Sequence, residues 1–207
     1  MIRHHRSVPP AERTLGQRGA VLVELGFVAI LLATLVAGAV DFGLGWRTTF
    51  AVTEGARTGA RVGSAQGNIV GADFALLSGM RSALSSSGLL ADVNRVVIYR
   101  SDSATGGIPS SCRTTTAATI SDPCNILTGD QFRALPATNT TGTTSATGCI
   151  TNSQTKSWCP TTRNNVQITA EYIGIWVQVT YKYKFKLVGS TQTIERTAVM
   201  RLEPTEG

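Results

Sequence analysis

The chain has 207 residues, a formal net charge of +6 and 15% charged residues, and its mean hydropathy is +0.07. This length allows one ordinary domain, or a small domain with an appendage, and a typical soluble domain is about 25% charged. The low charge density excludes a nucleic-acid-binding tail. Because most apolar residues gather in one run, a polytopic transporter is excluded as well.

Residues 1–19 form a short basic leader. Its charged residues are four arginines and one acid: Arg3, Arg6, Arg13, Arg18 and Glu12. Positive flanks stay on the cytoplasmic side of a membrane. The leader therefore predicts a cytoplasmic N-terminus, a single-pass protein of the plasma (inner) membrane and an extracytoplasmic C-terminal part.

Residues 20–40 read AVLVELGFVAILLATLVAGAV and contain one charge, Glu24. About 20 apolar residues suffice to cross a hydrocarbon core of ~30 Å. A surface helix of a soluble protein would show a polar face, and this run does not. We predict one transmembrane helix over residues 20–41, in contact with the lipid bilayer.

Three fates are open to this N-terminus. It can remain uncut as an anchor, or be cleaved as a secretory signal after Ala37-Gly38-Ala39, although a signal core is usually 7–15 residues. Alternatively, the leader is cleaved between Gly19 and Ala20 on the cytoplasmic side.

Cleavage between Gly19 and Ala20 would explain why an acid, Glu24, lies within the apolar run. An ionised acid at the centre of a membrane helix costs about 2.5–3.5 kcal/mol on the insertion scale, and less near the interface. Cleavage would make Glu24 the fifth residue of the mature chain, where it could pair with the new ammonium group of a neighbouring subunit and set the subunit register. The alternative is that Glu24 reaches to the interface.

The helical pattern continues as a stalk over residues 42–65. Three aromatic residues and then three glycines recur at four-residue spacing: Phe42, Trp46 and Phe50, followed by Gly55, Gly59 and Gly63. Such spacing places each set on one helical face, and small residues permit close helix packing. The alternative is two helices broken near Gly43–Gly45.

The rest of the chain, residues 66–207, predicts a small extracytoplasmic α+β domain. Apolar spacing over 69–84 predicts an amphipathic helix that ends at the serines 85–87, and 93–100 predicts a strand. Residues 102–165 are rich in Thr, Ser, Gly and Asn. We interpret them as a long loop region without a packed core. A loop of this length is uncommon, so short strands within it are the alternative.

All four cysteines lie in this loop region: Cys112, Cys124, Cys149 and Cys159. An even number in an exported domain indicates two disulfides. Three pairings are possible, and we favour the pairs that are close in sequence, 112–124 and 149–159. The spacing contains no Cys-x-x-Cys and no histidine follows His5, so we expect no metal site.

The C-terminus carries the clearest strand pattern. Odd positions from Ile173 to Leu187 are apolar, which predicts a half-buried strand. A turn at Gly189-Ser190 would return the chain with paired residue numbers summing to 379, so that Ile194 meets Phe185, Met200 meets Val179, Leu202 meets Val177 and Glu195 meets Lys184. Arg196 would then face Tyr183. Lys182, Lys184 and Lys186 are interpreted as a solvated edge, with a surface for an acidic partner or lipid as the alternative.

No arrangement of residues indicates catalysis. The two histidines, His4 and His5, lie in the leader, the acids of the outer domain are scattered, and no phosphate-binding loop occurs. We expect no enzyme, no cofactor, no nucleic acid and no small-molecule substrate.

Several segments resemble the TadE/TadF group of pseudopilins of the Flp (tight adherence) pilus. They are Arg18–Leu25 with its Gly-Ala-x-x-x-Glu pattern, Val40–Gly43, Thr53–Arg61 and Arg196–Glu203. Leu25 replaces the aromatic residue usual in the family. The resemblance implies a prepilin-type leader cut by a prepilin peptidase, and a minor subunit that assembles with other pilin-like subunits and an inner-membrane assembly platform into a surface pilus or related secretion apparatus. A single-pass anchor displaying a binding domain remains the alternative.

Overall fold

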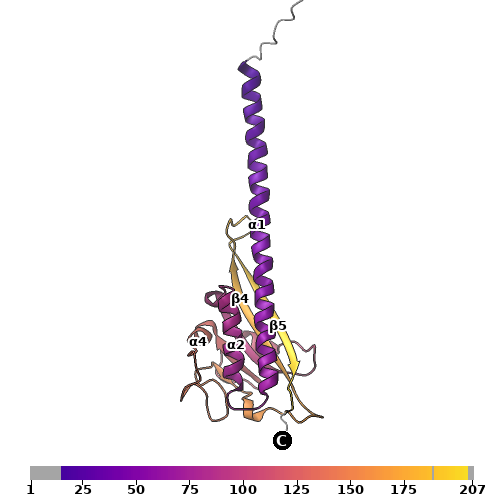
Figure 1. The fold of residues 1–207 in the computed structure, drawn as a ribbon, viewed down its shortest axis with the longest axis vertical. Helices are drawn as coiled ribbons and strands as arrows, with labels where there is room; N and C mark the ends of the chain where they lie inside the picture. The colour runs from indigo at the N-terminus through magenta and orange to yellow at the C-terminus, as the bar shows by residue number, and fades with distance from the viewer. Residues whose placement is uncertain (1–14, 188, 205–207) are drawn as a thin grey trace, which may run out of the picture.

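The computed structural model describes residues 15–187 and 189–204. Its dominant element is α1 (Leu15–Gln66), one helix of 52 residues. Its N-terminal part projects alone, and its C-terminal part joins a domain made of the remaining elements (Figure 1). The helix is continuous through residues 43–45, so the predicted single helix is confirmed there. Most of the leader lies outside the described residues.

The domain combines helices with one antiparallel sheet, which confirms the predicted α+β class. Its helical elements are α2 (Ala72–Ser86), η1 (Leu90–Asp92), α3 (Ser110–Thr114), α4 (Gly129–Arg133) and η2 (Pro160–Thr162). Its strands are β1 (Val93–Ser101), β2 (Cys124–Thr128), β3 (Thr155–Lys156), β4 (Tyr172–Lys182) and β5 (Thr191–Arg201). The helix predicted over 69–84 and the strand over 93–100 correspond to α2 and β1.

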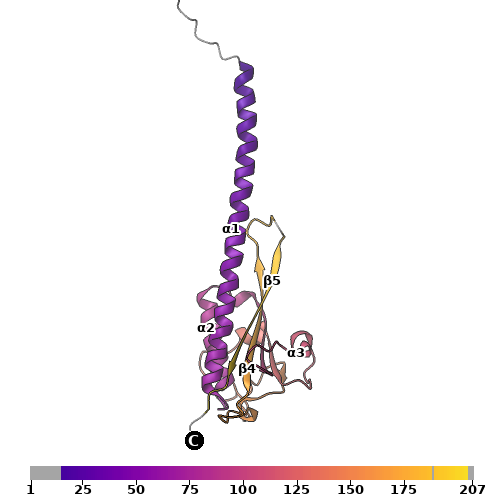
Figure 2. The same ribbon diagram turned by 90° about the vertical axis from the view of Figure 1, so that its right-hand side faces the viewer.

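The sheet has the strand order β3-β2-β1-β4-β5, with every neighbouring pair antiparallel. One face is covered by α1 and α2, and α3 lies on the other side (Figure 2). Alternation along β1 divides its side chains between the faces: Val96 and Ile98 join the helix-covered core, while Val97 and Tyr99 join a smaller cluster with Trp176. Both faces of the central strands are therefore buried.

The C-terminal half of α1 is part of the domain core. Val52, Ala56 and Ala60 are fully or almost fully buried, and the helix packs against α2, β4 and β5. The segment 42–65 is helical as predicted, but it does not project as a free stalk. Its small residues allow close packing against these elements, so this half of α1 is a structural part of the domain.

The region 102–165 is more structured than the loop interpretation allowed. It contributes two strands and three short helical elements, and it buries Ile126, Leu127, Phe132 and Trp158. The region contributes side chains to the core, so the prediction that it lacks a packed core is wrong. Since β2 has four consecutive buried residues, its sequence shows no alternation of apolar and polar positions that would have revealed it.

The C-terminal hairpin is present, but its predicted register is wrong. Tyr172 pairs with Arg201 and Lys182 pairs with Thr191, so paired numbers sum to 373 instead of 379. Ile194 consequently meets Val179 instead of Phe185, and Glu195 meets Gln178 instead of Lys184. The predicted and observed registers differ by an even number of residues, 6. Because side chains alternate with a period of two, each residue of β5 still lies on the predicted face of the sheet. The strand ends at Lys182, and residues 183–190 form the connection in place of a two-residue turn.

Candidate membrane and assembly surface

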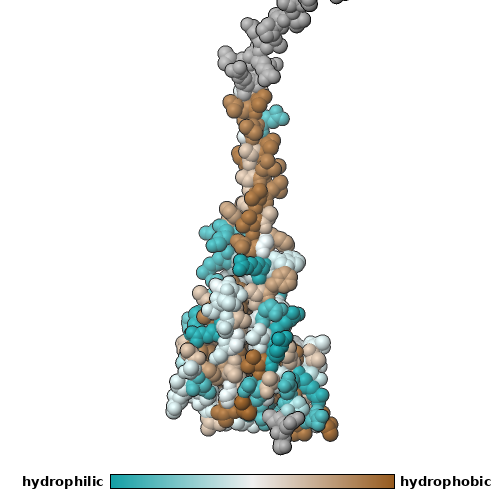
Figure 3. Space-filling model, viewed as in Figure 1, coloured by the Kyte–Doolittle hydropathy of each residue, from teal (hydrophilic) through white to brown (hydrophobic). Residues whose placement is uncertain are grey.

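The N-terminal part of α1 is an exposed apolar rod. It is long and apolar enough to cross a membrane, and the most apolar window has no buried residue. Residues such as Val23, Phe27 and Leu31 are at least 60% exposed. Figure 3 shows this rod as an almost uniformly hydrophobic surface that gives way to hydrophilic side chains where the domain begins. Exposed leucine and phenylalanine at this density need an apolar environment, which supports single-pass membrane anchoring.

Glu24 lies exposed on this rod. Among the residues whose side chains are described, none forms an ion pair with it. Gly19 and Ala20, the predicted cleavage point, are exposed residues within the first turns of α1. All three are therefore accessible to other proteins on the helix surface.

Asp41 marks the junction between the rod and the domain. Its side chain is 1% exposed, and its carboxylate accepts backbone N–H groups of the β4–β5 connection. Lys184 donates to Oδ1 at 2.8 Å, and Phe185 donates to Oδ1 at 3.1 Å and Oδ2 at 3.2 Å. These bonds fasten the connection to α1 directly after the last bond between the two arms of the hairpin, in which the Tyr183 N–H donates to the Ser190 oxygen at 3.1 Å.

Tyrosine packing supports the same junction. The Tyr181 hydroxyl donates to the backbone oxygen of Asp41 at 3.4 Å, and its ring meets that of Tyr183 edge to face at 5.1 Å. Burial, followed by the Asp41 carboxylate and Tyr183, raises the pKa of the Tyr181 phenol, so the hydroxyl remains a donor. A Cβ at Gly45 would stand 3.5 Å from the Tyr181 ring, an ordinary contact, so α1 and this ring pack side by side.

The aromatic row predicted on α1 is exposed. Trp46 lies 5.8 Å from both Phe42 and Phe50 between ring centroids, and all three are more than half exposed. They border a groove between α1 and β5 whose other wall includes Tyr183 and Arg196. Arg196 thus faces α1, opposite Val177. The row offers an apolar surface to a neighbour outside the described chain.

The three spaced glycines face the interior of the same molecule. An added Cβ would approach Leu84 from Gly55, Met80 and Leu76 from Gly59, and Leu76 and Ile173 from Gly63. Their smooth face is therefore occupied by α2 and β4. This face of α1 is covered within the molecule and is not exposed to other proteins.

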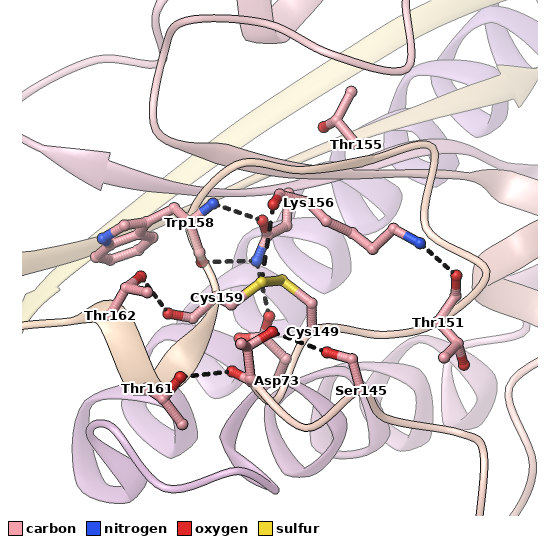
Figure 4. The surroundings of a disulfide bond; sticks show 12 residues. Asp73, Ser145, Cys149, Thr151, Thr155, Lys156, Trp158, Cys159, Thr161 and Thr162 are labelled. Carbon is pink, nitrogen blue, oxygen red and sulfur yellow. Dashed lines mark hydrogen bonds between the residues drawn. A yellow bond between two sulfur atoms is a disulfide. The ribbon is translucent and has the colours of Figure 1, made fainter.

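Two disulfides close the loops, and both have the predicted pairing: Cys112–Cys124 and Cys149–Cys159. Cys112 and Cys124 belong to the smaller cluster with Trp176, on the face of the sheet opposite α1 and α2. The second bridge lies next to a buried polar network (Figure 4). No described cysteine is free.

The network beside Cys149–Cys159 is centred on a buried ion pair. Arg163 pairs with Asp73, and their side chains are 0% and 1% exposed. Asn125 donates to Asp73 at 2.9 Å and to the Trp158 carbonyl at 2.8 Å, and the guanidinium carbon lies 4.4 Å from the Trp158 ring centroid. Burial raises the pKa of Asp73, and the adjacent Arg163 charge opposes this rise.

Sequence reasoning missed both acidic centres. Asp41 is predicted at the end of the membrane helix and in the Val40–Gly43 segment, without a contact to the domain, and Asp73 is not singled out. A signal for Asp73 existed, because it lies three residues before Leu76 and four before Leu77, which are fully buried on the core-facing side of α2. Within the described residues, no group of three or more His, Cys, Asp or Glu side chains could hold a metal ion.

Comparison with known proteins connects this surface to one family. Residues 19–61 match the family model described as TadE-like protein, which confirms the resemblance over the membrane segment and the helix beyond it. The match includes Glu24, Asp41 and the aromatic row. No curated protein and no solved structure matched the chain.

Proposed function

We propose that the protein is a membrane-anchored minor pilin-like subunit of a Tad (Flp) pilus or a related surface secretion apparatus. The observation that carries this proposal is the TadE-like match over residues 19–61, which coincides with the exposed apolar rod and its junction at Asp41. The role is assembly: the rod packs among subunits, and the disulfide-bonded domain contacts other pilus components outside the membrane.

In this proposal the leader stays in the cytoplasm and is removed by a prepilin peptidase. The positive leader supports that orientation, and two disulfides support an oxidising compartment for the domain. The mature subunit then binds an inner-membrane assembly platform and other pilin-like subunits.

Sequencing the mature N-terminus tests the proposal. We expect the membrane-extracted protein to begin at Ala20, because the exposed Gly19-Ala20 bond follows the basic leader. The control is Gly19→Leu, which should retain the leader while still inserting. A start at Val40 would show secretion instead, and an intact Met1 would show a plain anchor.

Glu24 provides a second test. We expect Glu24→Gln to insert normally but to be strongly depleted from sheared pilus fractions, because the carboxylate pairs with the Ala20 ammonium group of a neighbour in an apolar setting. Quantitative immunoblotting of membrane and pilus fractions measures the loss. Glu54→Gln is the matched control, since Glu54 is exposed on the same helix and already pairs with Arg57 at 3.0 Å. Equal incorporation of both variants would contradict a register role.

A further inference from the structure

The connection between β4 and β5 carries an unusual alternation of charge and hydrophobicity. Lys184, Phe185, Lys186 and Leu187 follow one another, with Phe185 55% exposed and Leu187 49% exposed. The lysines are exposed as well. Two large apolar side chains that alternate with cations and are exposed to water are unfavourable, so the environment of this segment decides whether they are stable.

Asp41 fixes the height of this connection along α1. It receives the backbone N–H groups of Lys184 and Phe185, so these residues lie level with the end of the apolar rod. The 22 residues from Ala20 to Asp41 span about 33 Å, close to the ~30 Å of a hydrocarbon core. Figures 1 and 2 both show this end of the hairpin beside α1, on the side from which the rod projects.

We propose that Lys184–Leu187 is a second membrane contact, which rests on the lipid surface at the foot of the transmembrane helix. The Phe185 and Leu187 side chains enter the boundary between headgroups and acyl chains, and the lysines bind anionic headgroup phosphates. The proposal rests on the membrane anchoring in the proposed function but does not require pilus assembly.

Three observations favour lipid as the occupant. The connection is held against a helix whose adjoining residues are themselves apolar and exposed, including Val36 and Val40. Each lysine close to an anionic surface is attracted to it, and Trp46, five residues beyond Asp41, is of the type enriched at membrane interfaces. In addition, Asp41 accepts the backbone N–H groups of Lys184 and Phe185, so these two donors are not left unpaired at this depth.

The test uses the full oxidised chain in phosphatidylcholine vesicles that contain phosphatidylglycerol. A polarity-sensitive fluorophore is attached at Leu187→Cys, at Val28→Cys within the rod, or at Ile168→Cys as the control. Ile168 is 89% exposed and precedes the end of β4 that lies opposite the connection. This 11-residue strand is about 36 Å long. We expect blue-shifted emission and quenching by brominated lipid at 187 and 28, and quenching by aqueous iodide at 168.

Two sets of variants test the contributions of the lysine charges and of the attachment to Asp41. Lys184→Gln with Lys186→Gln should reduce lipid quenching at 187 in anionic vesicles and leave it unchanged in pure phosphatidylcholine. Asp41→Asn should weaken the attachment to α1 and raise iodide access at 187 without affecting 28.

Each outcome has a definite reading. Lipid quenching at 28 with free iodide access at 187 overturns the second contact while leaving the anchor intact. Absence of lipid quenching at 28 overturns the anchor itself. Protection at 187 that appears only at high protein density, without lipid quenching, also overturns the proposal and identifies a second copy of the chain as the occupant.

Discussion

Replacing Asp73 by alanine should destabilise the domain by about 3–5 kcal/mol, because it leaves the Arg163 charge buried without its partner. The Arg163 side chain is fully buried. Its Nη2 donates to Asp73 and to the Trp158 carbonyl at 3.3 Å, whereas its Nε and Nη1 atoms have no hydrogen-bond partner among the described residues. Urea unfolding of the full chain in detergent, followed by circular dichroism, measures the change in the free energy of unfolding.

Two further variants separate charge from packing. Glu54→Ala breaks an ion pair whose side chains are 59% and 65% exposed, and it should change stability by less than about 1 kcal/mol. Combining Asp73→Ala with Arg163→Met removes both buried charges and should recover much of the loss. A loss for Asp73→Ala no larger than that for Glu54→Ala would show that the pair contributes little.

The same Gly→Ala substitution should have opposite effects at two points of α1. At Gly59 the new methyl group meets Met80 and Leu76 at 3.5–3.6 Å, an ordinary contact, so the gain in helix propensity stabilises by up to about 1 kcal/mol. At Gly63 it would stand 2.6 Å from Leu76 and 2.8 Å from Ile173. Both neighbours are fully buried, so overpacking should cost about 1–3 kcal/mol and outweigh the propensity gain.

Unfolding measurements on the two single variants test this difference. Gly43→Ala is the control, because a Cβ there would meet nothing within 4 Å, and it reports the propensity term alone. Stabilisation at position 63 equal to that at 43 would mean that α1 and α2 are not in the close contact described above.

The features that could be predicted from sequence depend on residues close to one another in the chain. The odd positions from Ile173 to Tyr181 point into one core, as strict alternation indicated. The apolar run, the continuous helix and the short-range cysteine pairs followed equally simple patterns.

The missed parts depend on long-range partners. The hairpin pattern continues to Leu187, yet the strand ends at Lys182, and Asp41, more than 140 positions earlier, binds the backbone of Lys184 and Phe185. Likewise, Asn125 is buried because it bridges Asp73 and Trp158. Neither dependence leaves a local signature in the residues around it.

The continuity of α1 couples what happens inside the membrane to what happens outside it. Glu24 and Phe42 are 18 residues apart (positions 24 and 42), which is about five turns at 3.6 residues per turn. They therefore point in nearly the same direction, and Trp46, one turn further along, is rotated from Phe42 by only about 40°. If a neighbouring subunit engages Glu24 near the cytoplasmic end of the membrane helix, it lies on the side of α1 that displays the aromatic row. The direction of that one contact would then decide which surfaces of adjacent domains face each other.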